Sequence, residues 1–235
     1  MIYKLYSYII ATPLFVISTF IVAVLIIISS ICRCDVLTHK YIPHLWGKMT
    51  FMIYLIPVKI YGIEKLDKKQ SYIFLANHQG YLDIPLMYGY LNHSFKWMMK
   101  DYLKKMPLVG IACMFSRQIF VGDSRASIAN AVNNARKTLY GGMSMAIFPE
   151  GTRTYDGKMI PFKRGAFMLA SEIGLPIVPI TINGSFKVFS RQAKSLTRAQ
   201  LSLIIHEPIT SEQCQEKNTK SLMTEVYDII ESGLE

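Results

Sequence analysis

The chain is poor in the residues that build disulfide scaffolds and metal sites. Its 235 residues include only four cysteines and five histidines. The cysteines have neither CxxC spacing nor the density of a disulfide-rich domain, which favours free thiols in a reducing compartment. The remaining sequence offers no ligand spacing either, so no zinc site is expected among the scattered histidines His39, His44, His93 and His206.

Several catalytic motifs are also missing. The sequence has no Walker A loop, no HExxH and no GxGxxG, which argues against nucleotide-phosphate, zinc-peptidase and dinucleotide sites. GMSMA at 142–146 differs by one residue from the GxSxG nucleophile elbow. It precedes its apparent strand, however, whereas an elbow follows one. Ser144 is therefore a poor candidate for a nucleophile.

Acidic residues are few, and this leaves a strongly basic chain. There are 26 Lys and Arg residues against 16 Asp and Glu, a formal charge of +10, and 51% of the residues are hydrophobic. An anionic bilayer, a phosphorylated substrate or a nucleic acid would each suit such a charge. Because the basic residues are dispersed, without a recognition module, we expect no nucleic-acid partner.

One long stretch near the N-terminus lacks charge altogether. No charged residue lies between Lys4 and Arg33, and residues 5–32 would reach about 42 Å as a helix, more than the ~30 Å hydrocarbon core of a bilayer. We expect a membrane helix with Pro13 in its first turns or at a kink. A signal peptide fits less well, because the run is too long and no small-x-small cleavage site follows. The basic residues after it predict a cytoplasmic location for the rest of the protein: Arg33, Lys40, Lys48 and Lys59.

The next apolar stretch, IPHLWGKMTFMIYLIP, is short for a second span because His44 and Lys48 interrupt it. We interpret it as an interfacial or re-entrant helix, with Tyr41, Trp46 and Tyr54 at headgroup level. A helix packed on the catalytic core is the alternative. The predicted organisation is a membrane-associated helical segment over residues 1–57 and an α/β domain over residues 58–235.

From residue 58 onward, short apolar runs alternate with amphipathic stretches. The runs that read as strands are VKIYGI, SYIFLA, FKWMM, RQIFVG, MSMAIFP, LPIVPITI and LSLIIH. SRASIANAVNNARKTLY has helical spacing, with Ser124 or Asp123 as its cap, and the closing segment from Ser211 to Leu234 repeats the pattern with Leu222, Val226 and Ile229 on one face. This alternation predicts an α/β fold with a largely parallel sheet flanked by helices.

The heptapeptide NHQGYLD, residues 77–83, begins where a predicted strand ends. In a regular helix His78 and Asp83 would lie about 140° apart around the axis, so they can meet only if the chain bends between them. Gly80 permits that bend. Asp83 would then hold the proton on one ring nitrogen and leave the other nitrogen as a base. A helix-capping turn without catalytic function is the alternative.

A second strand-end loop, FPEGTRTYDG at 148–157, offers a phosphate site. The guanidinium of Arg153 is a planar fork suited to phosphate, and Gly151 allows close approach of the backbone. Glu150 is expected to hydrogen-bond a hydroxyl or to orient the loop. In parallel sheets ligands collect beyond the carboxyl ends of the strands, where both loops begin.

In the order of these blocks the chain resembles the glycerolipid acyltransferases, most closely the bacterial type of 1-acylglycerol-3-phosphate acyltransferase. The resemblance implies that His78 is the general base and Asp83 its orienting partner. It implies substrate-binding roles for the FPEGTR residues Glu150, Gly151, Thr152 and Arg153, and for Lys163 in PFKRGA. LPIVPITI resembles the apolar fourth block, near Pro179.

One block departs from the family pattern, in which an arginine soon follows an apolar strand. Here RQIFVGDSR places Asp123 near that position and Arg125 two residues later. We carry the substrate-binding role over to Arg125, and Lys100 is a second candidate for the phosphate.

The resemblance implies acyl transfer from acyl-CoA or acyl carrier protein to the sn-2 hydroxyl of lysophosphatidic acid, giving phosphatidic acid at a bacterial cytoplasmic membrane. The thioester is a cosubstrate, and neither a held cofactor nor a metal is expected. The motifs barely separate this acceptor from glycerol 3-phosphate or another lysolipid. A non-catalytic membrane protein that binds lipid is the rival from another class.

Overall fold

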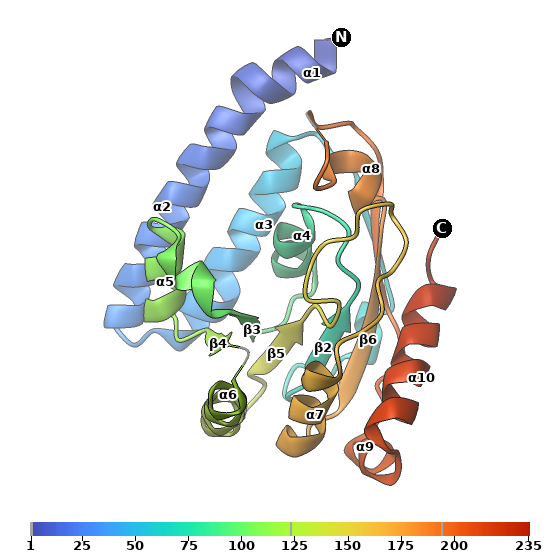
Figure 1. Cartoon of the computed structure of the whole chain (residues 1–235). Helices are drawn as coiled ribbons and strands as arrows, with labels where there is room; N and C mark the ends of the chain where they lie inside the picture. The colour runs from blue at the N-terminus through green and yellow to red at the C-terminus, as the bar shows by residue number, and fades with distance from the viewer. Residues whose placement is uncertain (1, 123, 194) are drawn as a thin grey trace.

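The computed structural model describes residues 2–122, 124–193 and 195–235, and its core is an α/β sandwich beside a helical hairpin (Figure 1). Within those ranges seven strands form one sheet in the order β1-β7-β6-β2-β5-β3-β4. The strands are β1 Val58–Tyr61, β2 Ile73–Ala76, β3 Phe95–Lys100, β4 Ile119–Val121, β5 Ser144–Ile147, β6 Ile177–Asn183 and β7 Leu201–Ile205. All neighbours pair in parallel except β6 and β7. The predicted α/β class and largely parallel sheet are confirmed.

Helices cover both faces of the sheet because its central strands are buried on both sides. Phe74 and Ala76 of β2 belong to one core cluster, and Ile73 and Leu75 to the other, as the alternation of side chains along a strand requires. The first cluster is closed by α3 Ile42–Ile53, α4 Asp83–Tyr90 and α8 Ser185–Phe189. The second is closed by α6 Arg125–Thr138, α7 Arg164–Ile173, α9 Ser211–Glu216 and α10 Thr219–Ser232. Short elements complete the domain: η3 Ile63–Lys65, η4 Asp101–Lys105 and α5 Val109–Phe115.

The helix predicted over residues 124–140 is α6, and Ser124 is its N-cap, since the hydroxyl accepts from the Ser127 amide at 3.1 Å. Asp123, the other candidate cap, lies outside the described residues. The closing segment differs from its predicted single pattern. It forms two helices, because Asn218 caps a new one at α10, and the buried face contains Ile230 beside Leu222 and Val226, while Ile229 is half-buried.

The N-terminal uncharged stretch is helical over 30 residues, Ile2–Ile31, and only 17% of its most apolar window is buried. It comprises α1 Ile2–Tyr6, the π-helical turn η1 Ser7–Ala11 and α2 Thr12–Ile31. Its length of about 45 Å exceeds the ~30 Å apolar thickness of a bilayer. Pro13 is the second residue of α2, just after the π turn, and the Thr12 hydroxyl donates to the Ser7 carbonyl at 2.7 Å. By length and composition this helix is able to cross a membrane.

The second apolar stretch is packed on the α/β core, as the alternative interpretation of the sequence predicted. After η2 Leu37–Tyr41, α3 crosses α4 so closely that a Cβ on Gly47 would lie 2.3 Å from the amide nitrogen of Gly89. Tyr54 is buried, and the Trp46 indole donates to the Thr19 hydroxyl at 3.0 Å. These two rings therefore face protein, because α3 fills the space between α2 and the sheet. Tyr41 is exposed.

Candidate active site

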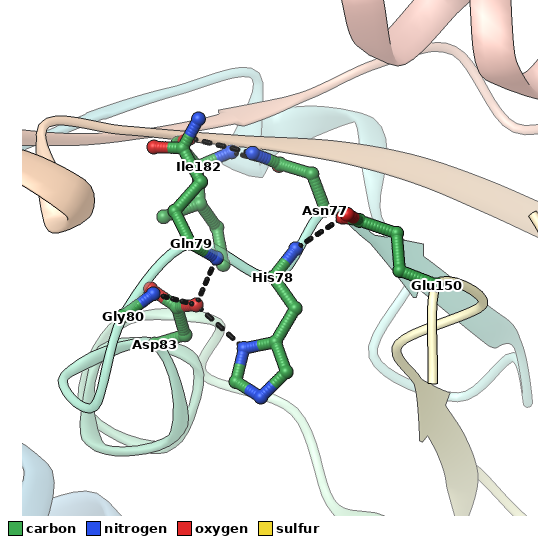
Figure 2. Close-up of polar contacts among 7 residues, drawn as sticks. All are labelled: Asn77, His78, Gln79, Gly80, Asp83, Glu150 and Ile182. Carbon is green, nitrogen blue, oxygen red and sulfur yellow. Dashed lines mark hydrogen bonds and ion pairs between the residues drawn. The ribbon is translucent and has the colours of Figure 1, made fainter. Parts of the chain in front are cut away.

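The site is built around the turn that joins β2 to α4. His78 lies in this turn and Asp83 is the first residue of α4. The His78 Nδ1 and Asp83 Oδ2 atoms are 2.7 Å apart, and the Asp83 side chain is fully buried (Figure 2). The same oxygen accepts from the amides of Gln79 at 2.7 Å and Gly80 at 2.9 Å. The chain therefore bends back onto the carboxylate, as the spacing of His78 and Asp83 predicted.

This arrangement fixes the tautomer of the neutral imidazole. Because the buried carboxylate only accepts hydrogen bonds, Nδ1 carries the proton and Nε2 presents its lone pair. Among the described residues Nε2 has no hydrogen-bond partner. The His78 side chain is 15% exposed, so part of it reaches the surface of the protein.

Neighbouring loops hold the turn in place. The Asn77 side chain donates from Nδ2 to the Ile182 carbonyl at 2.9 Å and accepts at Oδ1 from the Ile182 amide at 2.7 Å. These two hydrogen bonds connect the end of β2 to β6. Gly80 packs against α8, where a Cβ would lie 2.4 Å from the Ser185 hydroxyl and 2.9 Å from the Phe189 carbonyl. The bend thus requires glycine for space, because a Cβ at this position would clash with α8.

An aromatic stack supports the imidazole. The ring of Phe148 lies parallel to that of His78, with centroids 3.9 Å apart and planes 6° apart. Trp97 stacks on the other side of Phe148 at 4.9 Å. Sequence reasoning missed Phe148 as a site residue, although it opens the FPEGTR block. The contact with Phe148 restricts rotation of the His78 ring away from its hydrogen bond with Asp83.

Glu150 connects the two motif loops. Its side chain is buried, and Oε1 accepts from the His78 amide at 2.7 Å (Figure 2). The other oxygen, Oε2, accepts from the Ile160 amide at 2.9 Å. Burial raises the pKa of this carboxyl to about 7, although the two amide hydrogen bonds lower it; the charge of Asp83 raises it further. Of its two expected roles, these contacts fit orientation of the loop. Direct binding of a substrate by Glu150 has no support in this geometry, because the Glu150 side chain is buried.

Arg153 lies beside the turn that contains His78 and Tyr81. Its guanidinium stacks over the ring of Tyr81, with 3.6 Å from Cζ to the ring centroid. None of its N–H groups donates to a protein oxygen within the described ranges. Since stacking occupies only the face of the guanidinium, its N–H edges are available to an anion.

Two cations from outside the FPEGTR block, Lys163 and Arg191, lie against Gly151 and Thr152 and form a cationic rim with Arg153. Gly151 has a φ of 71°, and a Cβ there would lie 2.8 Å from the Lys163 ammonium nitrogen, so the lysine passes directly over the glycine. Thr152 is exposed, and its hydroxyl accepts from Arg191 at 3.5 Å. Arg191 also lies over the Tyr155 ring at 4.7 Å. Sequence reasoning missed Arg191, since it belongs to no motif and reaches this loop only through the fold.

The two further phosphate candidates lie along the same edge of the sheet. Lys100 is the last residue of β3, and its register partner on β4 is Val121. Arg125 begins α6 after β4, while its side chain is outside the described part of the structure. In the sheet order, β5 separates β3 from β2, so both candidates start farther from His78 than the FPEGTR loop does.

Other residues considered in the sequence have structural contacts. Ser144 is buried at the start of β5, where its hydroxyl accepts from the Tyr72 amide at 2.9 Å. His93 bonds the Gln70 carbonyl at 3.0 Å, and His206 the Thr181 hydroxyl at 2.8 Å. No group of three or more potential metal ligands occurs among residues 2–122, 124–193 and 195–235.

Comparison with known proteins identifies the family. A model of the Acyltransferase family matches residues 57–183. The chain is 31% identical over 175 residues to the chloroplastic 1-acyl-sn-glycerol-3-phosphate acyltransferase BAT2 of Brassica napus, covering 73% of this chain and 50% of that protein. It is 32% identical over 162 residues to 1-acyl-sn-glycerol-3-phosphate acyltransferase alpha of Homo sapiens, covering 68% and 57%. It thus spans about half the length of the curated relatives it matches.

A solved structure supports the same conclusion. The crystal structure of PlsC from Thermotoga maritima, a 1-acyl-sn-glycerophosphate acyltransferase, matches with a TM-score of 0.71 and 27% identity, over 81% of this chain and 76% of that one. The region that the family model matches contains both motif loops and the strands β1 to β6. From the family model, the relatives and the shared fold together, we conclude that the chain belongs to the Acyltransferase family.

Proposed function

We propose that this protein transfers a fatty acyl group from a thioester to the sn-2 hydroxyl of 1-acylglycerol 3-phosphate. The observation that carries the proposal is the 2.7 Å contact between His78 Nδ1 and the buried Asp83 carboxylate, which leaves Nε2 as a base. The names of the relatives support this acceptor, since those reported above are 1-acylglycerol-phosphate acyltransferases.

In the proposed step, Nε2 of His78 takes the proton of the acceptor hydroxyl while the hydroxyl oxygen attacks the thioester carbonyl. The carbon–sulfur bond then breaks, and the leaving thiolate recovers the proton from the imidazolium. An ester and a free thiol result, without an acyl-enzyme. A positioned base contributes about 10²–10⁴-fold to such reactions, and orientation of the two substrates adds to it.

The acceptor phosphate is proposed to bind at the cationic rim beside the turn. Arg153 offers the edge of its guanidinium for bidentate contacts. Lys163 lies over Gly151 and adds a second positive charge. Lys100 and Arg125 remain proposals for the same headgroup from the adjoining strands.

The donor is proposed to be acyl-CoA or acyl carrier protein, which arrives as a cosubstrate and leaves as free thiol, so no held cofactor or metal is assigned. The apolar helix Ile2–Ile31 supports membrane attachment. The excess of basic residues after this helix favours the cytoplasmic face of a bacterial membrane.

The test supplies the full chain in vesicles with acyl-CoA and 1-acylglycerol 3-phosphate, and measures thiol release together with the mass of the lipid product. The His78→Ala variant should release no thiol, because it lacks the base, yet remain in the membrane fraction. A panel with glycerol 3-phosphate and other lysolipids distinguishes the acceptors. Normal turnover by the His78 variant would contradict the mechanism, and lipid binding without thiol release by the unmodified chain would favour the non-catalytic rival.

A further inference from the structure

The connection between β3 and β4 carries an apolar surface that the catalytic mechanism does not use. Tyr102 in η4 and Met106 after it are both exposed. In α5, Ile111, Met114 and Phe115 are exposed by 42, 44 and 46%. These three residues follow the i, i+3, i+4 spacing of one helix face, and they are called the α5 face below.

The α5 face is held rigidly by its surroundings. The inner side of the helix is buried at Gly110 and Ala112, and a Cβ on Gly110 would lie 2.4 Å from the Lys104 carbonyl. Leu108 before the helix and Arg117 after it have φ values of 57° and 52°. Such conformations are unfavourable for a residue other than glycine, and they persist only where the surrounding structure enforces them.

The α5 face continues the apolar surface of the N-terminal helix. α5 packs against α2, and Figure 1 shows it alongside the C-terminal half of that helix. α2 also exposes large apolar side chains, among them Phe20 and Ile28. A bilayer that receives α2 is therefore next to α5 as well.

Basic residues border the α5 face. Lys104 and Lys105 are exposed at the end of η4, although Lys104 forms an ion pair with Asp101 at 2.7 Å. A lysine near an anionic leaflet strengthens binding to it by electrostatic attraction. An apolar face rimmed by lysines suits the boundary between acyl chains and anionic headgroups.

The sheet topology relates this surface to the active site. β2, β5 and β3 are parallel, so their carboxyl ends meet at one edge. The His78 turn follows β2 and η4 follows β3 directly. Both therefore leave the sheet at the same edge, and contact of α5 with a bilayer brings the catalytic edge towards the membrane.

We propose that the α5 face inserts into the anionic bilayer that also receives α2, with Lys104 and Lys105 at headgroup level, as a second attachment point. One helix alone leaves the domain free to rotate about its axis. Two adjacent attachments remove that freedom and direct the His78 edge towards lipid. The proposal rests on the membrane attachment in the proposed function and is independent of acyl transfer.

The experiment measures lipid contact at single positions of the full chain. Cys32, Cys34 and Cys113 are replaced by alanine, and one cysteine is introduced by Met114→Cys, Phe20→Cys or Tyr140→Cys and labelled with a fluorophore. Tyr140 is a matched control, since it is 72% exposed and lies in the turn before β5, at the opposite edge of the sheet. The labelled chains are placed in vesicles of phosphatidylcholine and phosphatidylglycerol, at about one chain per vesicle. The lipids carry a nitroxide quencher about 5–10 Å below the headgroups, the depth expected for an interfacial helix.

We expect the label at position 114 to lose fluorescence to an extent comparable with position 20, whereas position 140 keeps its fluorescence. Ile111→Cys repeats the measurement on the same face, should Met114→Cys fold poorly. Quenching at 20 but not at 111 or 114 would overturn the proposal while leaving attachment by α2 intact. Loss of quenching at all of these positions would overturn the attachment by α2 too. Quenching at 114 that appears only at many chains per vesicle would assign the face to a second copy, and so would also overturn the proposal.

Charge reversal tests the anionic component. Lys104→Glu with Lys105→Glu should reduce quenching at position 114 in vesicles containing phosphatidylglycerol. Lys68→Glu with Lys69→Glu is the matched control, because this exposed pair precedes β2 at the opposite edge and should leave quenching unchanged. An equal effect of the two pairs would contradict the assignment of Lys104 and Lys105 to headgroup level.

Discussion

Glu150→Gln should change how the stability of this protein depends on pH. Burial raises the pKa of Glu150 from an ordinary value of 4.5 to about 7. The folded protein therefore binds this proton more tightly than the unfolded chain does. The stability that results is fully present below pH 4.5 and is lost as the pH rises to about 7. The pKa therefore differs by about 2.5 between the folded and the unfolded state, and at about 1.4 kcal/mol for each pKa unit this contributes about 3 kcal/mol to the free energy of unfolding.

The amide that Glu150→Gln introduces carries no charge at any of these pH values, so the variant lacks this contribution to the pH dependence. The melting temperature of the unmodified protein, relative to that of Glu150→Gln, should fall by about 6–12 °C between about pH 4.5 and pH 8, since 1 kcal/mol corresponds to about 2–4 °C for a chain of this size. The assay is thermal unfolding of both proteins in the same detergent across this range. The comparison between the two proteins cancels the titration of all other groups.

Glu216→Gln is the matched control, because Glu216 is exposed and the substitution removes one negative charge from the surface. Its melting temperature should change with pH in parallel with that of the unmodified protein. If Glu150→Gln and the unmodified protein lost stability in parallel across this pH range, the carboxyl would not be a buried group that prefers its proton. The assignment of Glu150 as a buried link between the two motif loops would then be wrong.

Three further substitutions test the geometry of the site. Asp83→Asn should reduce turnover by about 10²–10⁴-fold, because the amide oxygen at the Oδ2 position still accepts from His78 Nδ1 but carries no negative charge to stabilise the imidazolium. It should also destabilise the fold by about 1–3 kcal/mol, because Asp83 Oδ1 is buried without a partner among the described residues and an amide NH₂ placed there would be unsatisfied. Kinetics and thermal unfolding of the same preparation measure both effects, and unchanged turnover would exclude a catalytic role for the Asp83 charge. Gly80→Ala should cost about 1–3 kcal/mol of stability through its clash with Ser185, and an unchanged melting temperature would show that the turn has space. Arg153→Lys should raise the KM for the phosphorylated acceptor about 10–100-fold by loss of bidentate contacts, with the KM for the donor as internal control; equal changes in both would argue against a phosphate site at this residue.

The succession of strands and helices along the chain could be predicted from the sequence because the signals are local. The alternation of apolar runs with a 3.6-residue period is visible without any contact, and every predicted strand is present. The bend at Gly80 followed from the five-residue spacing of His78 and Asp83. The sequence could not decide between the two interpretations of α3, because apolar residues that face protein and those that face lipid look the same in a sequence. Trp46 and Tyr54 were assigned to headgroups, whereas in the fold Trp46 bonds Thr19 of α2 and Tyr54 is buried.

Local sequence was sufficient for the α/β class, the uncharged N-terminal helix and the residues of the two motif loops, since each depends on side chains within a few positions of one another. Other features required the folded chain: Glu150 bonds the His78 amide across 72 positions, Phe148 stacks on the imidazole, and Arg191 reaches Thr152. These contacts exist because the carboxyl ends of β6, β2 and β5 lie side by side in the sheet. The order of the strands across the sheet arises from packing of the whole chain, and no local pattern encodes it.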